Sequence, residues 1–262
     1  MGLSSDKLKD KVCVVSGAAK SIGFAIAEKF ASQGAIVILT DISEEVLESA
    51  KTLADKGYKA TGYIHDVTDR EATLELFKQI TDEFGPVYVL VNNAGVVDQR
   101  PFEENTEEVY DRMFRVNVYG TSWCIQGALP GMKEAREGRI INFSSKSGKT
   151  GSALMEPYSA AKGAIIALTH ALAFEYAPYN ININCVCPGI TDATGVWASV
   201  SKSYTENLKM EREKVVEQFS AKIPLKRLTS IEDVVEYVFF LAAAGDYCTG
   251  QALNITGGRE VH

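Results

Sequence analysis

The sequence predicts an α/β fold in which a doubly wound parallel β-sheet carries helices on both faces. Short runs of β-branched, apolar residues alternate with amphipathic helical stretches over residues 12–141. These runs are continuously apolar, a pattern typical of parallel strands buried on both faces. Because right-handed crossovers join such strands, a doubly wound sheet is the simplest topology. No linker rich in Pro, Gly or Ser divides the chain, so we expect a single domain over residues 1–262.

Each apolar run is assigned as a strand, and the third run is the weakest. In chain order the expected strands are 12–16, 36–41, 58–64, 87–91, 139–143, 181–186 and 252–255. Helical periodicity starts soon after the first strand, where Ile22, Ile26 and Phe30 share one face. The expected helices are 22–33, 45–53, 70–84, 109–128 and 158–176.

A long, polar, helix-prone stretch over about 190–221 breaks this rhythm and contains Trp197 and Tyr204. It follows the sixth strand, beyond the carboxyl end, where open α/β sheets bind their ligands. We therefore expect this stretch to be a loop that covers a substrate pocket, with Trp197 contacting the substrate. Burial of Trp197 in the core, or a subunit contact, is the alternative.

Charge and composition exclude several classes of function. The formal net charge is 27 − 34 = −7, which argues against a nucleic-acid or anionic-membrane surface. No apolar run reaches the roughly 18 residues of a membrane span, and the charged N-terminus lacks the apolar core of a signal peptide. The five cysteines and three histidines show no metal-ligand spacing. We expect a cytoplasmic protein with no bound metal and with no membrane or nucleic-acid partner.

A small-residue loop joins the first strand to the first helix and contains Gly17, Ser21, Ile22 and Gly23. Small residues let the backbone approach a pyrophosphate closely, and a helix N-terminus supplies free N–H groups and a favourable dipole. Asp41 ends the second strand, 18 residues beyond Gly23, where a carboxylate can accept hydrogen bonds from an adenosine ribose. Together these features predict a dinucleotide site.

Further motifs follow in a fixed order along nearly the whole chain. They are Gly17-x-x-x-Ser21-Ile22-Gly23, Asp66-Val67, Asn92-Asn93-Ala94-Gly95, Asn117, Ser145, Tyr158-x-x-x-Lys162, Pro188-Gly189 and Thr256-Gly257-Gly258. This ordered set resembles the short-chain dehydrogenase/reductase family. The resemblance implies a Rossmann-type fold and a nicotinamide-dependent oxidoreductase that acts on an alcohol or carbonyl carbon.

The resemblance also implies how the chain would hold its cofactor. Asp66 and Val67 would hold the adenine, while Asn93, Gly95 and Ile190 would lie along the dinucleotide. Two positions depart from the family pattern. Ser21 replaces the middle glycine of the loop, and Ala193 stands where relatives often have a threonine that contacts the nicotinamide amide. Thr191 and Thr194 flank Ala193, and the sequence does not decide between them.

Two charges bear on the choice between NAD and NADP. Asp41 would repel a 2′-phosphate, which favours NAD. Lys20 precedes Ser21, where NADP-using relatives often carry a base. We give more weight to the carboxylate because its repulsion acts at short range, and therefore expect NAD, with NADP as the alternative.

Tyr158 and Lys162 are four residues apart on a predicted helix, so they share a face. A free tyrosine has a pKa near 10. A nearby ammonium and the positive ring of an oxidised cofactor would lower that pKa and make Tyr158 a proton acceptor. By resemblance, Lys162 would also bind the nicotinamide ribose, Ser145 would hold the substrate oxygen, and Asn117 would bend its helix and hold a water that links Lys162 to solvent.

The sequence determines the identity of the substrate less well than the type of reaction. Lys146, Lys149 and Glu156 predict a mixed-charge pocket, suited to a small polyol, diol, hydroxy acid or phosphorylated sugar. We favour polyol or diol oxidation by NAD, with an acyl-carrier ketoreductase as the rival. A non-catalytic redox sensor that binds dinucleotide is the alternative of another class. The helices at 109–128 and 158–176 resemble those that build subunit contacts in relatives, so we expect a homotetramer.

Overall fold

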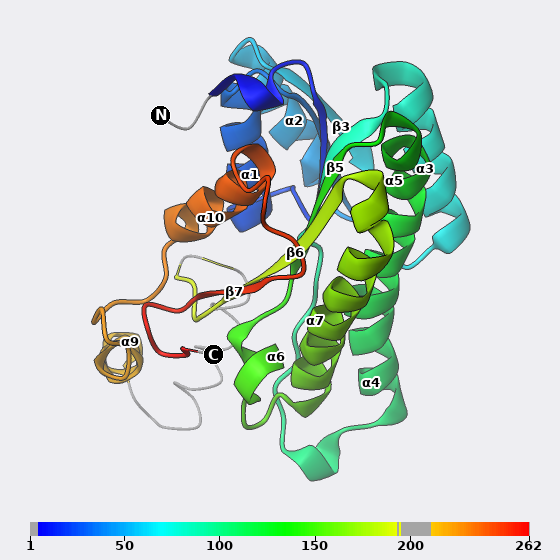
Figure 1. Cartoon of the computed structure of the whole chain (residues 1–262). Helices are drawn as coiled ribbons and strands as arrows, with labels where there is room; N and C mark the ends of the chain where they lie inside the picture. The colour runs from blue at the N-terminus through cyan, green and yellow to red at the C-terminus, as the bar shows by residue number, and fades with distance from the viewer. Residues whose placement is uncertain (1–4, 193, 195–210, 262) are drawn as a thin grey trace.

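The computed structural model describes residues 5–192, 194 and 211–261, and its centre is a parallel sheet (Figure 1). Within those residues the sheet has seven strands in the order β3-β2-β1-β4-β5-β6-β7. The strands are β1 Val12–Ser16, β2 Ile36–Asp41, β3 Lys59–Ile64, β4 Val87–Asn92, β5 Gly138–Phe143, β6 Ile181–Pro188 and β7 Ala252–Ile255. This is the doubly wound α/β topology that the sequence predicts.

Helices cover both faces of the sheet. The α-helices are α1 Ser21–Ser32, α2 Glu45–Asp55, α3 Arg70–Phe84, α4 Glu107–Phe114, α5 Thr121–Ala135, α6 Lys146–Thr150, α7 Glu156–Tyr176, α9 Arg212–Ala221 and α10 Ile231–Ala243. A π-helical segment, η3 Arg115–Gly120, joins α4 to α5, and short 3-10 turns lie at Ser5–Leu8, Phe102–Glu104 and Ala177–Tyr179. No helix among the described residues is both long and apolar enough to cross a membrane.

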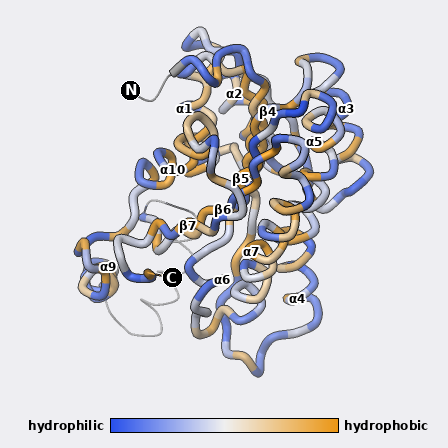
Figure 2. Tube along the Cα trace, in the orientation of Figure 1, coloured by the Kyte–Doolittle hydropathy of each residue, from blue (hydrophilic) through white to orange (hydrophobic). Residues whose placement is uncertain are grey.

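Two hydrophobic clusters bury the two faces of the sheet. Side chains of α1, α2 and α10 pack on one face, and side chains of α3, α5 and α7 pack on the other. Figure 2 shows hydrophobic residues concentrated along the central strands and the inner sides of the flanking helices. Strands β1, β4 and β5 are buried along their whole length, which explains why apolar residues predominate in β1 and β4.

The predicted strands are confirmed to within two residues at each end, but the helices differ in three places. The helix expected at 109–128 is a longer run, with the π-helical segment Arg115–Gly120 inside it. The short helix α6 and the long helix α10 were not expected. A sequence signal for α10 does exist, because Ser230 and Asp233 form a capping box at its start.

Strand order reverses direction between β1 and β4, which lie side by side although β2 and β3 separate them in sequence. Ser16, at the carboxyl end of β1, is paired in register with Thr40 of β2 and Asn92 of β4. Ligands of open α/β sheets bind at such a switch point. The fold therefore brings the loop after β1 and the segments after β4, β5 and β6 to one edge of the sheet.

Candidate active site

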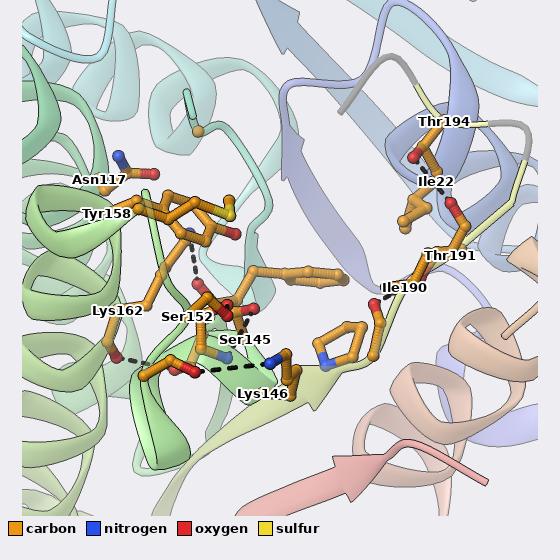
Figure 3. A pocket seen from close by; sticks show the side chains of 18 of the residues that line it. Ile22, Asn117, Ser145, Lys146, Ser152, Tyr158, Lys162, Ile190, Thr191 and Thr194 are labelled. Carbon is orange, nitrogen blue, oxygen red and sulfur yellow. Dashed lines mark hydrogen bonds between the residues drawn. The ribbon is translucent and has the colours of Figure 1, made fainter. Parts of the chain in front are cut away.

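A cavity of about 380 Å³ opens at this edge of the sheet (Figure 3). Its walls come from the first turn of α1, the segment after β4, the β5–α6 connection, the start of α7 and the segment after β6. Several residues singled out in the sequence line it together: Ile22, Asn93, Gly95, Asn117, Ser145, Tyr158, Lys162 and Ile190. The expected catalytic residues Asn117, Ser145, Tyr158 and Lys162 thus converge on one space from three separate segments.

Ser145 and Tyr158 lie together on one side of the cavity (Figure 3). Ser145 caps α6, where its Oγ accepts a hydrogen bond from the Ser147 N–H at 3.1 Å. Burial raises the pKa of Tyr158 above its ordinary value of 10, and the nearby Ser145 hydroxyl offsets part of that rise. The phenol and the hydroxyl both line the cavity.

The neighbouring serine has a different environment. Ser144 is buried, and its Oγ donates a hydrogen bond to the Lys162 carbonyl at 2.7 Å. It thereby ties the end of β5 to α7. Of the two serines, Ser145 is the one whose hydroxyl affects the pKa of Tyr158, and its role at the substrate oxygen stays a prediction.

Lys162 is almost completely buried, with 5% of its surface exposed. Its Nζ donates to the Phe143 carbonyl at 2.8 Å and lies 5.7 Å from the centre of the Tyr158 ring. Burial lowers the pKa of Lys162 to about 8, because desolvation disfavours the ammonium. The sequence predicted that Lys162 would lower the pKa of Tyr158. In the structure burial dominates and raises it, since the ammonium is directed at a backbone carbonyl and is not in contact with the phenol oxygen.

Asn117 lies in the π-helical segment and is fully buried. Its Nδ2 donates to the carbonyls of Met113 at 2.9 Å and Val96 at 3.0 Å, and its Oδ1 accepts from the Val96 N–H at 3.3 Å. Single-turn π segments within α-helices are often found at functional sites. The local distortion expected at Asn117 is present, and its amide group binds the irregular segment that follows β4 to this helix.

The loop between β1 and α1 leaves no room for larger residues at its glycines. Gly17 has a φ of +64°, and a Cβ on Gly23 would lie 2.2 Å from the Gly17 carbonyl oxygen. The Asn93 side chain donates to the Ser16 and Gly17 carbonyls at 3.1 and 2.8 Å, which fixes the loop against β4. Ser21 has a φ of +57°, a conformation that strains an L-residue with a side chain. The loop therefore keeps a glycine-like backbone conformation at Ser21, although serine replaces the middle glycine of the family pattern.

Asp41 closes this loop from the end of β2. Its Oδ2 accepts from the Ala19 N–H and its Oδ1 from the Ser43 N–H, both at 3.0 Å. Lys20 points away, with 74% of its side chain exposed and a long ion pair of 3.4 Å to Glu45. The carboxylate is thus held in place at the dinucleotide end, while the lysine is a solvated surface group.

Other residues assigned to the cofactor lie near the edge of the sheet but do not line the cavity. Asp66 is exposed, and its Oδ1 accepts from the backbone N–H and hydroxyl of Thr68. Val67 is buried against Gly120 of the π-helical segment.

Both threonines after Pro188-Gly189, Thr191 and Thr194, line the cavity, where the Thr194 Oγ1 donates to the Thr191 carbonyl at 2.9 Å. Trp197 lies outside the described residues.

The structure adds cavity residues that the sequence did not single out. Arg259, at the C-terminal end of the chain, lines the same cavity as Ser145 and Tyr158. Phe219 of α9 and Met155 also line it. Periodicity and motif spacing carry no information on such contacts, because they join segments far apart in sequence.

A switch-point cavity with a small-residue loop at one end and a Ser–Tyr–Lys set at the other defines an oxidoreductase that uses a nicotinamide dinucleotide. The short chain dehydrogenase family profile matches residues 11–205. The chain therefore belongs to the short-chain dehydrogenase family, whose members oxidise alcohols or reduce carbonyl groups with NAD(H) or NADP(H).

Known proteins resemble this chain over nearly its whole length. A sorbitol dehydrogenase from Cereibacter sphaeroides is 34% identical over 255 residues, which cover 96% of this chain and 98% of the relative. A crystal structure of NAD⁺-bound xylitol dehydrogenase matches with a TM-score of 0.91 at 30% identity, covering 96% of this chain and all of that one. An actinorhodin polyketide ketoreductase variant with NADPH also matches with a TM-score of 0.91, at 32% identity, covering 96% and 98%.

Proposed function

We propose that this chain is an NAD-dependent dehydrogenase of small polyols or diols. The observation that carries the proposal is the single cavity that Ser145, Tyr158 and Lys162 share with the residues of the dinucleotide end. Its volume of about 380 Å³ suits a small substrate beside a nicotinamide. Similarity to a sorbitol dehydrogenase and to a xylitol dehydrogenase structure supports a polyol substrate.

The chain's residues fit a nicotinamide dinucleotide. The two glycines of the β1–α1 loop leave no room for a Cβ, as expected where a backbone must approach a pyrophosphate. Ile22 and Ile190 line the cavity on the side opposite Tyr158 (Figure 3). When bound, the cofactor supplies the hydride acceptor for alcohol oxidation. Asn93, Gly95 and Lys162 would line its nicotinamide half, and Asp66 and Val67 its adenine.

In the proposed mechanism Tyr158 accepts the hydroxyl proton of the substrate as a phenolate. Ser145 donates a hydrogen bond to the same substrate oxygen and holds it in place. Because burial raises the pKa of Tyr158, the phenolate needs nearby positive charge. The Lys162 ammonium, 5.7 Å from the ring, and the charge of an oxidised nicotinamide supply it. Asn117 keeps the π-helical turn that positions the floor of the cavity, and would hold a water leading from Lys162 to solvent.

NAD is proposed over NADP on the geometry of Asp41. Both of its carboxylate oxygens are fixed by backbone N–H groups, so the charge cannot swing away from an added 2′-phosphate. A charge pair at about 4 Å is worth roughly 4 kcal/mol at an effective dielectric of 20. Lys20 offsets little of this repulsion, since its side chain is exposed and already directed at Glu45.

The chain is further proposed to be one domain that assembles as a cytoplasmic homotetramer. A single sheet extends from Val12 to Ile255, which supports one domain. Aromatic side chains are exposed on the two elements expected to form subunit contacts, Tyr119 at 49% and Phe174 at 85%. All five cysteines are free thiols, which suits a reducing compartment. Light scattering after size exclusion should give about four times the 28.5 kDa chain mass, and a monomer would contradict the assembly.

A panel of alcohols and ketones, followed by nicotinamide absorbance with NAD and NADP in parallel, tests the proposed function. We expect sorbitol, xylitol or butane-2,3-diol to reduce NAD. Reduction of an acetoacetyl thioester by NADPH, with no activity on any alcohol, would instead favour the ketoreductase function suggested by the actinorhodin ketoreductase structure. Dinucleotide binding without turnover of any compound would favour a redox sensor.

A further inference from the structure

Two cations line the cavity beside the Ser145–Tyr158 pair, and neither takes part in the proposed chemistry. Lys146 directly follows Ser145 and lies next to it in Figure 3. Arg259 reaches the same cavity from the C-terminal end of the chain. Electrostatic repulsion from Arg259 helps to lower the pKa of Lys146, behind the larger effect of burial, so the two charges act on one another.

Arg259 is positioned by the turn that follows β7. Gly257 and Gly258 have φ values of +63° and +88°, and a Cβ on Gly257 would lie 2.7 Å from the Ile223 side chain. The Arg259 N–H donates to the Thr256 carbonyl at 3.2 Å. The closing Thr256-Gly257-Gly258 motif thus turns the chain after β7 and directs Arg259 back to the cavity.

Neither cation is neutralised within the cavity. Lys146 has no carboxylate within ion-pair distance in the part of the chain that the structure describes, and its Nζ makes only a 3.5 Å contact with the Gly151 carbonyl. Arg259 meets Glu260 through Nε alone, at 3.4 Å, and its terminal nitrogens donate to no described residue. Lys146, Arg259 and Glu260 together leave one net positive charge beside the substrate oxygen site.

We propose that the preferred substrate is a small hydroxy acid whose carboxylate lies between Lys146 and Arg259 while its secondary hydroxyl reaches Ser145 and Tyr158. A guanidinium matches the planar carboxylate with two parallel hydrogen bonds. A monoanion also balances the one net charge better than a dianionic phosphate does. This inference rests on the proposed function, because it keeps the same active site and the same alcohol oxidation. It changes only the preferred substrate, from a neutral polyol or diol to a hydroxylated compound that also carries a carboxylate.

Matched substrate pairs test the inference. Gluconate differs from sorbitol, and 3-hydroxybutyrate from butane-1,3-diol, by a carboxylate in place of a terminal CH₂OH group. For the wild type we expect kcat/KM to favour each acid by about tenfold or more, as a charge-assisted hydrogen bond provides. Arg259→Met should lower the acid-to-neutral ratio by about tenfold, and Arg259→Lys should restore part of it.

The Glu260→Gln variant distinguishes recognition of the substrate carboxylate by Arg259 from a purely structural role of the C-terminal turn. It removes a negative charge next to Arg259, so the acid-to-neutral ratio should rise. Damage to the C-terminal turn would not raise the acid-to-neutral ratio, which Arg259→Met should lower. Lys78→Met, on the outer surface of α3 where Lys78 pairs with Asp82, removes a cation far from the cavity and should leave the ratio unchanged.

The outcomes distinguish this inference from the proposed function. If the neutral alcohols are oxidised, the acids show no higher kcat/KM, and Arg259→Met leaves the acid-to-neutral ratio unchanged, the hydroxy-acid inference fails. The proposed dehydrogenase function is then retained. A preference for sorbitol 6-phosphate over gluconate would also overturn it. If no alcohol is oxidised, the proposed function fails, and calorimetry with gluconate and NADH decides the inference. Binding that Arg259→Met weakens about tenfold supports it, and absence of binding overturns it.

Discussion

At the β1–α1 loop, Asp41 and Asn93 each bind the protein's own backbone through more than one side-chain contact, whereas Ser145 and Tyr158 line the cavity with their hydroxyl groups. Asp41 accepts one N–H group from this loop and one from the segment after β2, and Asn93 donates to two carbonyls at the start of the loop. Ser145 and Tyr158 both line the cavity. The first region is a rigid, mainly backbone surface for a ligand, and the second consists of titratable groups whose burial shifts their pKa values.

This difference predicts that changes at the two ends alter different quantities. Substitutions at the loop should change cofactor affinity and cofactor choice, with turnover largely retained. Substitutions at Tyr158 or Lys162 should remove turnover while the loop still binds dinucleotide. The energetic consequences differ as well, because burial of Lys162 opposes folding, whereas the hydrogen bonds of Asp41 support it.

Lys162→Met should have the largest combined effect. Turnover should fall by at least about a hundredfold, because the charge that favours the Tyr158 phenolate is lost. The free energy of unfolding at pH 7 should rise by about 2 kcal/mol, since a buried ammonium is removed. Denaturant unfolding and steady-state kinetics on one preparation measure both. A variant that is both active and less stable would contradict the assigned role.

The pH dependence of that stability gain has a definite sign. The pKa of Lys162 is about 8 in the folded chain and 10.5 when unperturbed. Between these values the unfolded chain holds the proton and the folded chain does not, so wild-type stability rises with pH through this window. The advantage of Lys162→Met should be full below pH 8 and shrink towards pH 10.5. A constant difference across that window would mean that Lys162 is not desolvated.

Asp41→Asn should have an intermediate effect, confined to cofactor choice. The amide oxygen can still accept one N–H group of the loop, but the charge is gone. The wild type should prefer NAD by at least about tenfold in kcat/KM, and the variant should narrow this ratio through better use of NADP. Lys20→Met is the control and should leave the ratio almost unchanged. If Lys20→Met has the larger effect, the surface lysine decides the cofactor and the preference for NAD is wrong.

Ser21→Gly should have the smallest effect, on stability alone. A side chain at a φ of +57° costs about 1 kcal/mol, and the flexibility of glycine in the unfolded chain cancels part of the relief. We expect a net gain of about 0.5 kcal/mol in the free energy of unfolding. Ser32→Gly, at the other end of α1, should instead destabilise. Equal losses from both substitutions would show that the strain at Ser21 is absent.

Sequence patterns determine the strands well because continuous burial on both faces demands continuous apolar runs, as in β1 and β4. Helix α10 is missed although the sequence contains a signal for its start, the Ser230–Asp233 capping box. The π-helical turn at Asn117 is implied only by family resemblance, since a change in hydrogen-bond spacing leaves no mark on periodicity.

The residues of the candidate site also fall into those that the sequence predicts and those that it does not. Tyr158 and Lys162 are predictable because they are near neighbours on one helix. The Phe143 carbonyl that binds the Lys162 ammonium is not, because it lies on a different strand. Arg259 joins the cavity only through the turn at Gly257 and Gly258, a long-range contact that no local pattern contains.

Tyr158→Phe tests the division between the two regions most directly, when NADH affinity and alcohol-dependent NAD reduction are measured on the same sample. The phenyl ring keeps the packing of Tyr158 and removes only its proton-transferring oxygen. Turnover on a verified substrate should fall by at least about a hundredfold, while the NADH dissociation constant changes little. Near-wild-type turnover would remove Tyr158 from its role as proton acceptor, and loss of NADH binding would show that the two ends of the site are not separable.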